Sequence, residues 1–556
     1  MMNSENRNAA AIRALLRENI RNIVPYSTAR DDCKARMEIY LDANESPFDN
    51  GVNRYPSPHQ PELKKRLSVL KGIREENIFL GNGSDEPIDL VFRLFCPPGE
   101  SSMVQITPTY GMYRVAAEIN DVEVIDSPLG PDFSLDASSL LGKIREDTKV
   151  IFLCSPNNPS GNLLDRGEIL KILDNFGGIT VVDEAYIDFS GAESLAGLVE
   201  KYPGLIVLQT LSKAWGMAGL RIGMAVADRN IVDIMSRIKY PYNISVPDQT
   251  RAAELLSDPF RTMDRVALLV KERERMSRIL GTLPCVDKVW HSDANFLLVK
   301  FFRKDDVFSD LAEHGIIVRD RSSAHNCEGC LRITVGTPEE NDRLLSVLGW
   351  ENPETSYTGV PDTADRTASC SRKTGETSVI VRVNLDRFRR PEIATGLHFF
   401  DHMLEQIGFH AGITLDVVCF GDLETDDHHT IEDVAIALGE CFYSALGDKA
   451  GIGRYGFSLP MDEAEAAVLL DLGGRTDFRW DVTFAGDRTG DVSTQMFPHF
   501  FKSLAEHLKC NLHIRASGEN DHHIIEGVFK AFARALRQAV ERSTSGTSVP
   551  SSKGSL

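Results

Sequence analysis

One short motif occurs twice near the C-terminal end of the chain, and this repeat constrains the fold of that part most strongly. Residues 427–432 and 521–526 both read Asp-His-His-x-x-Glu, and an apolar, helix-like segment follows each copy. An internal repeat of this kind predicts an α+β domain built from two duplicated βα-type half-domains. Histidine is also unevenly distributed, since ten of the 14 histidines lie after residue 390. The chain therefore joins two unlike parts.

The spacing within the motif predicts metal binding. On a helix, the first histidine and the glutamate are i, i+4 neighbours, and the second histidine and the glutamate are i, i+3 neighbours, so each pair can share a face. The two adjacent histidines point about 100° apart at ~3.6 residues per turn, and cannot easily bind one ion together. One His-His pair is more often a surface accident, but two identically spaced copies favour two metal sites, each completed from elsewhere. Such nitrogen and oxygen ligands suit manganese, iron or zinc. The predicted ligands are His402, His428, His429, Glu432, His499, His522, His523 and Glu526.

The first 350 residues alternate between strand-like and helix-like segments. The runs 150–156, 179–186 and 205–212 are apolar enough to be strands buried on both faces, and 165–176 is helix-like. This order predicts an α/β fold with a mainly parallel sheet, whose ligands lie beyond the carboxyl ends of the strands.

Composition marks the boundary between the two parts of the chain. The polar stretch 351–371 contains two prolines and is predicted to be a linker, followed by the second part over 372–556. The Ser-rich last fourteen residues are typical of a frayed tail.

The overall composition excludes several classes of function. The chain has 81 acidic and 61 basic residues and a formal net charge of -20, which argues against binding nucleic acid or an anionic membrane. No apolar run approaches the ~20 residues of a membrane span. Because the ten cysteines are scattered and lie mostly in apolar segments, they are interpreted as reduced core thiols of a cytoplasmic protein. The lone Cys327-x-x-Cys330 pair is not expected to bind metal.

Polar groups follow three of the predicted strands. Each is a weak sign of a cofactor site on its own; an Asp after a strand, for example, is more often a helix cap than a cofactor contact. In this order, the segments 155–161, 183–186 and 212–223 together resemble the fold-type I aminotransferases that use pyridoxal phosphate. The resemblance implies that Lys213 holds the cofactor as a Schiff base, and that Asp183 keeps the pyridine nitrogen protonated. It implies that Arg332 binds the substrate's carboxylate or phosphate. It also implies a large domain over about 55–245 and a small domain formed by the N-terminal segment together with about 250–350. It assigns further cofactor contacts to Tyr55, reaching across a dimer interface, and to Ser84, Asp85, Tyr110, Asn158, Tyr186, Ser212 and Arg221.

Within that superfamily, the segments LDANESP, NRYPSP and SKAWGMAGLRIG look most like histidinol-phosphate aminotransferase. Threonine-phosphate decarboxylases and aromatic aminotransferases share much of this pattern, so a different substrate is an alternative. A member without catalytic activity is a second alternative.

The second part resembles imidazoleglycerol-phosphate dehydratase over about 372–556, through TGLHFFDHMLEQIGFH, GDLETDDHHTIED, NDHHIIEGVFKAFARALRQA and SSKG. The resemblance implies that Glu376 is a proton-transfer group. His398 stands where this family usually has Gly or Pro, and is a further candidate ligand. The groups implied to hold the substrate phosphate are Arg454, Arg475, Lys530, Ser551 and Lys553, so the tail should fold over a phosphate.

Together, the two resemblances imply consecutive steps of histidine biosynthesis. Imidazoleglycerol phosphate would be dehydrated with manganese to imidazole-acetol phosphate, and this ketone transaminated with glutamate to give histidinol phosphate and 2-oxoglutarate. They also imply a homo-oligomer, with an aminotransferase dimer and a larger dehydratase shell. A regulatory protein that keeps both sites without turnover is the rival interpretation, and Lys213 and Glu376 argue against it because pure binding would not require them.

Overall fold

The computed structural model describes residues 4–24, 38–351, 365–456 and 459–542. The chain divides into two compact units, which are described separately. The N-terminal unit comprises residues 1–67 and 73–356, and the C-terminal unit comprises 68–72 and 357–556. Among the described residues, no helix is long and apolar enough to cross a membrane.

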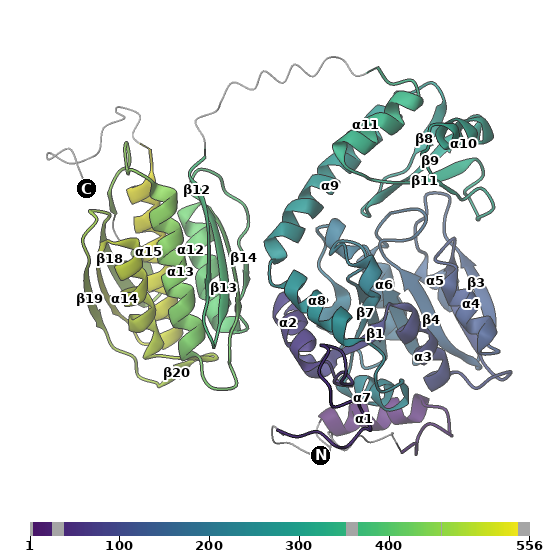
Figure 1. Ribbon diagram of the computed structural model, residues 1–556, viewed down its shortest axis with the longest axis horizontal. Helices are drawn as coiled ribbons and strands as arrows, with labels where there is room; N and C mark the ends of the chain where they lie inside the picture. Colours follow the sequence, from purple (N-terminus) through teal and green to yellow (C-terminus); the bar gives the residue numbers. More distant parts are fainter. Residues whose placement is uncertain (1–3, 25–37, 352–364, 457–458, 543–556) are drawn as a thin grey trace. The chain divides into compact units, whose positions relative to one another are not determined.

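The N-terminal unit is built on a seven-stranded sheet with the order β1-β7-β6-β5-β4-β2-β3 (Figure 1). Strand β7 runs antiparallel to both of its neighbours, and the other neighbouring pairs are parallel. The strands are β1 (Ile78–Asn82), β2 (Ser102–Thr107), β3 (Glu123–Pro128), β4 (Thr148–Cys154), β5 (Ile179–Asp183), β6 (Leu205–Thr210) and β7 (Ile222–Ala227). The three predicted apolar strands correspond to β4, β5 and β6, so the predicted α/β sheet is confirmed.

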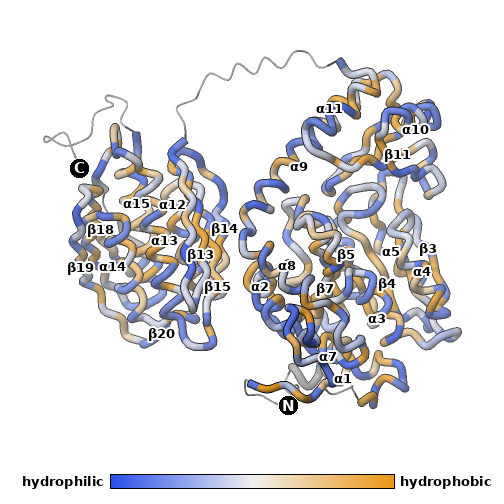
Figure 2. The backbone as a smooth tube through the Cα atoms, viewed as in Figure 1, coloured by the Kyte–Doolittle hydropathy of each residue, from blue (hydrophilic) through white to orange (hydrophobic). Residues whose placement is uncertain are grey.

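Helices cover the sheet because their apolar faces need a partner surface. Side chains of α1, α3, α4 and α7 form one buried cluster with alternate strand residues such as Phe152 and Val181, and the apolar residues collect inside the unit (Figure 2). The helices that lie wholly or mostly in this unit are α1 (Ser4–Leu15), α2 (Pro61–Lys71), α3 (Asp85–Phe95), α4 (Met112–Ile119), α5 (Ala137–Leu141), α6 (Arg166–Asn175), α7 (Arg229–Ile238), α8 (Val246–Leu256), α9 (Pro259–Leu280), α10 (Lys304–Glu313) and α11 (Pro338–Val347).

The described N-terminal residues 4–24 pack on the large sheet and not in the small domain, where they were expected. Ile12 and Leu16 are four residues apart, so they share one helical face, and both are buried in the core of the large sheet. The small domain instead has its own sheet, ordered β10-β11-β9-β8, with a separate apolar core. Its strands are β8 (Val286–Val289), β9 (Phe296–Phe301), β10 (Arg319–Asp320) and β11 (Cys330–Thr334).

The C-terminal unit consists of two halves with the same architecture. One sheet has the order β12-β13-β15-β14 and the other β16-β18-β22-β19, and in both the last pair is parallel while the other pairs are antiparallel. The elements of the first half are β12 (Thr367–Lys373), β13 (Ser378–Asn384), β14 (Glu392–Ala394), α12 (His398–Ala411), β15 (Thr414–Phe420) and α13 (His428–Leu446). Those of the second half are β16 (Tyr455–Gly456), β17 (Leu459–Met461), β18 (Ala464–Asp471), β19 (Asp477–Val482), β20 (Arg488–Thr489), β21 (Val492–Ser493), α14 (Met496–Leu508), β22 (Asn511–Ser517) and α15 (Asp521–Val540).

The four long helices of this unit lie between the two sheets and share one apolar core with them (Figure 1). The predicted duplication is therefore confirmed, and each copy of the repeated motif begins a helix, α13 or α15. Strand β12 begins at Thr367, inside the stretch 351–371 predicted to be a linker. Its inward side carries the small, half-buried Ala368 and Cys370, which pack against the core, so the strand has too little apolar character for composition to reveal it.

Candidate functional sites

Parallel strands bring three polar segments to one edge of the large sheet. Asp183 is the last residue of β5, and its register partners are Cys154 on β4 and Leu208 on β6. The chain segments that follow β4 and β6 carry Asn158 and Lys213. The strand order therefore places these side chains beyond neighbouring carboxyl ends, where ligands of such sheets bind.

Asp183 is a buried carboxylate held at both oxygens. Its Oδ2 accepts a 2.6 Å hydrogen bond from the Tyr113 hydroxyl, and its Oδ1 accepts one of 3.0 Å from the backbone N–H of Ala185. Burial raises the pKa of Asp183, while the bonds from Tyr113 and Ala185 act in the opposite direction. Such a carboxylate can pair with a protonated ring nitrogen.

Lys213 lies close to the aromatic and cationic groups of the site. Its Nζ is 5.8 Å from the ring centroid of Tyr186. Desolvation by the surrounding protein, followed by the positive charge of Arg332, lowers the pKa of the Lys213 amine. A lysine with a lowered pKa is more often neutral, which makes it a better nucleophile toward a carbonyl.

A chain of hydrogen bonds joins the large sheet to the small one. Arg332, on β11, donates from Nη1 to Oδ1 of Asn158 at 2.6 Å, and Asn158 donates from Nδ2 to the Tyr186 hydroxyl at 3.4 Å. These groups offer donors suited to a phenolic oxygen and an anionic substrate.

The start of α3 forms a cradle suited to phosphate. Ser84 precedes the helix, and the backbone N–H of Gly83 donates to the Arg221 carbonyl at 2.6 Å. Gly223 is required for this close approach, because a Cβ there would lie 2.4 Å from the backbone N of Ser84. A helix N-terminus beside a guanidinium group attracts an anion. Asp85 faces this group, with Oδ2 at 3.5 Å from Nη2 of Arg221.

Two more predicted cofactor residues have different surroundings. The Tyr110 hydroxyl lies 3.4 Å from Oδ1 of Asp85, and burial together with that charge raises the pKa of Tyr110 to about 12. Tyr55 is half exposed and stacks on Tyr242, with ring centroids 4.5 Å apart. Its contact across a dimer interface stays a prediction, as does the cofactor contact of Ser212.

The sequence did not single out two arginines that lie beside Arg332. Arg319 on β10 is the register partner of Arg332 on β11. Burial, followed by the positive charge of Arg332, lowers the pKa of Arg321. The Nε atoms of Arg321 and Arg332 are buried and make no hydrogen bond to the described residues. Guanidinium groups with unused donors favour an anionic ligand. In sequence, the Arg-Asp-Arg segment is indistinguishable from a solvated surface charge.

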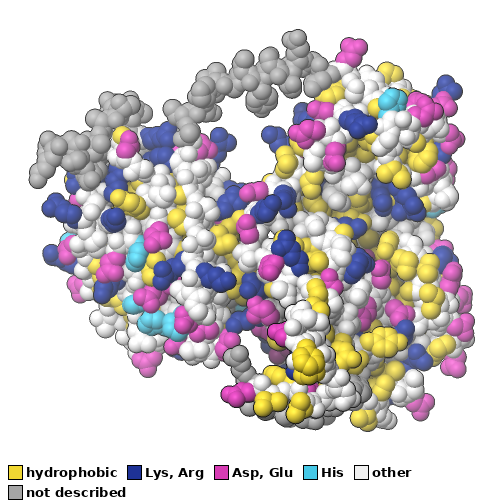
Figure 3. All heavy atoms as spheres, in the orientation of Figure 1, with side chains coloured by type: hydrophobic (Ala, Val, Ile, Leu, Met, Phe, Trp, Pro, Cys, Tyr) yellow, Lys and Arg dark blue, Asp and Glu magenta, His cyan; other side chains and the backbone are white. Residues whose placement is uncertain are grey.

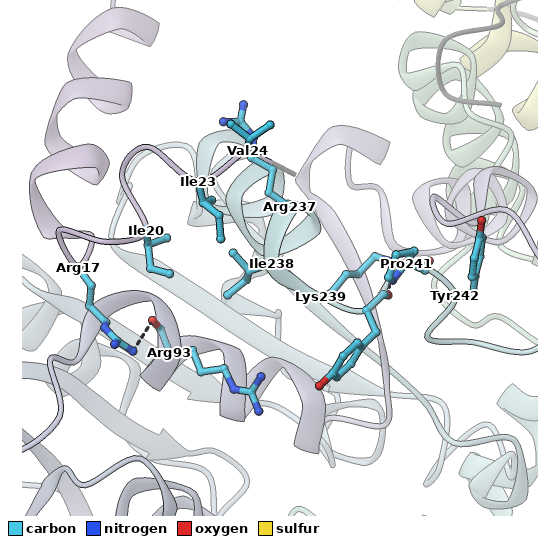
Figure 4. Close-up of a pocket in the computed structure, with 11 residues that line it drawn as sticks. Arg17, Ile20, Ile23, Val24, Arg93, Arg237, Ile238, Lys239, Pro241 and Tyr242 are labelled. Atoms are coloured by element: carbon cyan, nitrogen blue, oxygen red, sulfur yellow. Dashed lines mark hydrogen bonds between the residues drawn. The ribbon is translucent and has the colours of Figure 1, made fainter. Parts of the chain in front are cut away.

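A cavity of ≈ 730 Å³ lies elsewhere in this unit (Figure 4). Isoleucines such as Ile20 and Ile238 line it together with basic groups, and Arg17 donates to the Arg93 carbonyl at 3.0 Å. Its lining includes neither Lys213 nor Asp183. The cavity is therefore separate from the site around Lys213.

In the C-terminal unit, where several histidines reach the surface (Figure 3), side chains form three groups that could hold a metal ion. Two of them combine residues of both halves, and the third, Asp462 with Glu463 and His523, lies within the second half. The first group contains His402 from α12 with His522 and Glu526 from α15, and the possible ligand atoms all lie within 4.8 Å of one another. Nε2 of His522 is 3.3 Å from Oε2 of Glu526. Lys530 also approaches this carboxylate, with Nζ 2.7 Å from Oε1.

The second group mirrors the first. It contains His428 and Glu432 from α13 with His499 from α14. Nε2 of His428 is 3.5 Å from Oε2 of Glu432, and Nε2 of His499 is 3.3 Å from Oε1. The Nε2 atom of His499 is buried, yet it makes no well-formed hydrogen bond within the described part of the chain. Imidazole nitrogens and a carboxylate converging in this way fit a divalent cation.

The second histidine of each motif lies outside these two groups. Nδ1 of His429 is 3.1 and 3.2 Å from the two carboxylate oxygens of Asp422, and Nδ1 of His523 is 2.9 and 3.0 Å from those of Glu463. Each carboxylate raises the pKa of its histidine. The predicted i, i+4 pairs, in which the first histidine of each motif lies beside its glutamate, thus form. The second histidines instead face Asp422 and Glu463.

The remaining predicted residues of this unit are dispersed. Glu376 is exposed in the turn between β12 and β13, and its charge also helps raise the pKa of His429. Nε of Arg454 donates to Oδ1 of Asp471 at 2.6 Å, and Arg475 is exposed in the segment after β18. His398 is exposed at the start of α12. The predicted phosphate ligands Ser551 and Lys553 lie outside the described residues.

The N-terminal fold and site define a fold-type I aminotransferase, and the C-terminal groups define a duplicated domain able to bind metal. A family model described as aminotransferase class I and II matches residues 30–348, and one described as imidazoleglycerol-phosphate dehydratase matches 395–536. The chain belongs to the class I and II aminotransferases and continues into an imidazoleglycerol-phosphate dehydratase domain. It is a bifunctional enzyme, a transferase joined to a hydro-lyase, as predicted.

Several curated relatives match the N-terminal part of the chain over nearly their whole length. The histidinol-phosphate aminotransferase of Parabacteroides distasonis is 52% identical over 337 residues, which are 61% of this chain and 98% of that protein. That of Cytophaga hutchinsonii is 48% identical over 344 residues, or 61% of this chain and 99% of the relative. A crystal structure of the Clostridium acetobutylicum histidinol-phosphate aminotransferase has a TM-score of 0.50 at 23% identity, covers 53% of this chain and 90% of its own, and shows the shared fold.

Proposed function

We propose that the C-terminal unit dehydrates imidazoleglycerol phosphate to imidazole-acetol phosphate, and that the N-terminal unit transaminates this ketone with glutamate to give histidinol phosphate. The observation that supports this most is the presence, in one chain, of a site with Lys213 close enough to Asp183 to feel its charge and of two histidine–glutamate groups. The product of the first reaction is the substrate of the second, so the two would be consecutive steps of histidine biosynthesis. A decarboxylase or an aromatic aminotransferase would not consume the dehydratase product.

In the N-terminal unit, each residue has a defined task. Bound pyridoxal phosphate supplies an electron sink for transamination. Lys213 attaches the cofactor, and its amine, with a lowered pKa, then moves the proton at the substrate α-carbon. Asp183 pairs with the ring nitrogen, and the cradle at Ser84 and Arg221 holds the cofactor phosphate. Arg332, with Arg319 and Arg321, holds the substrate phosphate.

In the C-terminal unit, the two histidine–glutamate groups would hold the metal. Bound manganese supplies a Lewis acid that polarises the imidazole of the substrate. This assistance is needed because a carbon beside an imidazole is barely acidic. Glu376 moves the proton at that carbon, and Arg454, Arg475 and Lys530, with Ser551 and Lys553, bind the phosphate.

Oligomerisation would complete both kinds of site. Each of the two histidine–glutamate groups offers one glutamate and two histidines, and the half-exposed His429 and His523 are the remaining predicted ligands. Supplied by a second copy of the chain, each would add a further nitrogen. The half-exposed Tyr55 would similarly reach a partner's cofactor. Residence in the cytoplasm stays a prediction from the sequence.

Separate assays of the two reactions test this proposal. Lys213→Ala is expected to abolish transamination and to leave dehydration unchanged. Substituting both His429 and His523 by alanine is expected to remove bound metal and dehydration, and to leave transamination unchanged. Lys201→Ala, at an exposed lysine of the N-terminal unit, serves as the control. Transamination by the Lys213→Ala variant, or dehydration at the full rate by metal-free protein, would contradict the proposal.

A further inference from the structure

The second histidines of the repeated motif are each bonded to a carboxylate, but the two carboxylates come from different places in the duplicated fold. Asp422 lies in the segment between β15 and α13 and accepts from His429. Glu463 lies in the turn between β17 and β18 and accepts from His523. The two halves therefore make the same bond from positions that the duplication does not relate.

The position equivalent to Glu463 in the first half is the turn between β12 and β13. That hairpin closes on the pair Lys373 and Ser378, as the second closes on Met461 and Ala464. The first turn carries Glu376, whose side chain is exposed. The His429 Nδ1 atom is already bonded to both oxygens of Asp422. Glu376 is therefore not needed to hold that ring.

Segment length explains why the halves differ. In the first half, residues 421–427 connect β15 to α13, whereas 518–520 connect β22 to α15. The longer connection brings Asp422 beside the ring of His429. Both connections end in the same helix cap, because Asp426 accepts from the backbone N–H of His428 and Asn520 from that of His522, each at 2.9 Å. The shorter connection has no further residue in place of Asp422. The hairpin glutamate supplies the acceptor for His523 instead.

An imidazole that donates from Nδ1 has its lone pair on Nε2, so an acid bonded to Nδ1 decides which nitrogen can bind a metal. Both rings remain accessible, because His429 keeps 41% of its side chain exposed and His523 keeps 34%. Each Nε2 is thus available to a metal held by another copy of the chain.

We propose that Asp422 and Glu463 are positioning residues that orient His429 and His523 for metal binding, and that the longer first-half connection releases Glu376 from this task to act on the substrate. The inference rests on the proposed dehydratase function. The two equivalent glutamates thus have different roles, since Glu463 orients a metal ligand and Glu376 acts on the substrate.

The test compares variants of the full chain by three measurements: bound manganese after dialysis, assembly size by sedimentation velocity, and the dehydration rate. Asp422→Ala and Glu463→Ala are each expected to weaken manganese binding roughly 10–100-fold, and to shift the protein toward smaller assemblies. Asp422→Asn, which keeps an oxygen acceptor, is expected to restore part of the binding. Glu376→Gln is expected to retain metal and assembly size while its dehydration rate falls on the order of 10²–10⁴-fold.

Glu465→Ala removes an exposed carboxylate from the hairpin that carries Glu463, and is the matched control. Transamination by the same preparations, with thermal melting, shows whether each variant is folded. Unchanged metal binding in folded Asp422→Ala and Glu463→Ala proteins would overturn the inference while leaving the dehydratase function intact. A loss of metal in Glu376→Gln as large as in those two variants would also overturn the inference. A wild-type chain that dehydrates without metal would overturn the proposed function and the inference together.

Discussion

The hydroxyl of Tyr113 donates a 2.6 Å hydrogen bond to Oδ2 of Asp183, and both side chains are buried. Tyr113 stacks on Phe152, with ring centroids 4.8 Å apart, so packing fixes the position of its hydroxyl. Because burial raises the pKa of Asp183, this donor helps keep the carboxylate ionised. A buried tyrosine in the core therefore helps set the charge of the carboxylate at the carboxyl edge of the sheet.

Tyr113→Phe removes this donor without changing the packing. A hydrogen bond to a charged group contributes about 1.5–3 kcal/mol, so kcat for transamination is expected to fall roughly 10-fold or more. KM for glutamate should change little, since Tyr113 does not touch the substrate. Tyr202→Phe is the control, because Tyr202 makes a 3.0 Å bond to Asp174 at the surface. Equal kcat values in the two variants would contradict this role.

The lowered pKa of Lys213 predicts how cofactor attachment depends on pH. The neutral amine is the reactive form, so the rate at which cofactor-free protein takes up pyridoxal phosphate should rise with pH. Its midpoint should lie below the ordinary lysine value of about 10.4. Arg332→Gln removes a positive charge that lowers this pKa, and should move the midpoint upward. Absorbance of the bound cofactor measures both, and a midpoint at or above the ordinary value would show the assignment to be wrong.

Arg321 is expected to bind the substrate phosphate. Arg321→Gln should raise KM for histidinol phosphate roughly 10-fold, because one charge-assisted hydrogen bond is lost. The half-reaction with glutamate should be unaffected. Arg303→Gln, at an arginine with 82% of its side chain exposed in the small domain, is the control. A change in the glutamate half-reaction of equal size would instead indicate a general disturbance of the site.

Glu432 belongs to one of the two histidine–glutamate groups. Glu432→Gln is therefore expected to reduce bound manganese by about half, and to reduce dehydration without affecting transamination. Elemental analysis of the dialysed protein measures the metal. Glu440→Gln alters an exposed carboxylate on the same helix and should retain all of it. Full metal occupancy in Glu432→Gln would argue against this group as a metal site.

The fold was predictable where local pattern and burial coincide. Strands β4, β5 and β6 are buried along their whole length, so each reads as a continuous apolar run. The apolar face of α1 predicts that the helix is buried, but not against which sheet, and its assignment to the small domain failed for this reason. The inward side of β12 has only the small Ala368 and Cys370 as apolar residues, so the strand was mistaken for a linker.

The sites were predictable only in part. Spacing along a helix places His428 beside Glu432 and His522 beside Glu526, and both pairs form. Spacing cannot reveal that His402 and His499 come from the opposite half, because that depends on how α12 packs on α15 and α13 on α14. In the sequence, Arg321 cannot be distinguished from an ordinary surface charge. Its place near Arg332 becomes apparent only from the pairing of β10 with β11, in which Arg319 lies opposite Arg332.

The most direct test of the account is a single reaction catalysed by the purified chain. Imidazoleglycerol phosphate, manganese, pyridoxal phosphate and glutamate are supplied, and histidinol phosphate and 2-oxoglutarate are measured over time. The account predicts both products in equal amounts, with imidazole-acetol phosphate accumulating instead when glutamate is omitted. Dehydration without any histidinol phosphate, at saturating glutamate and cofactor, would contradict the pairing of these two reactions in one chain.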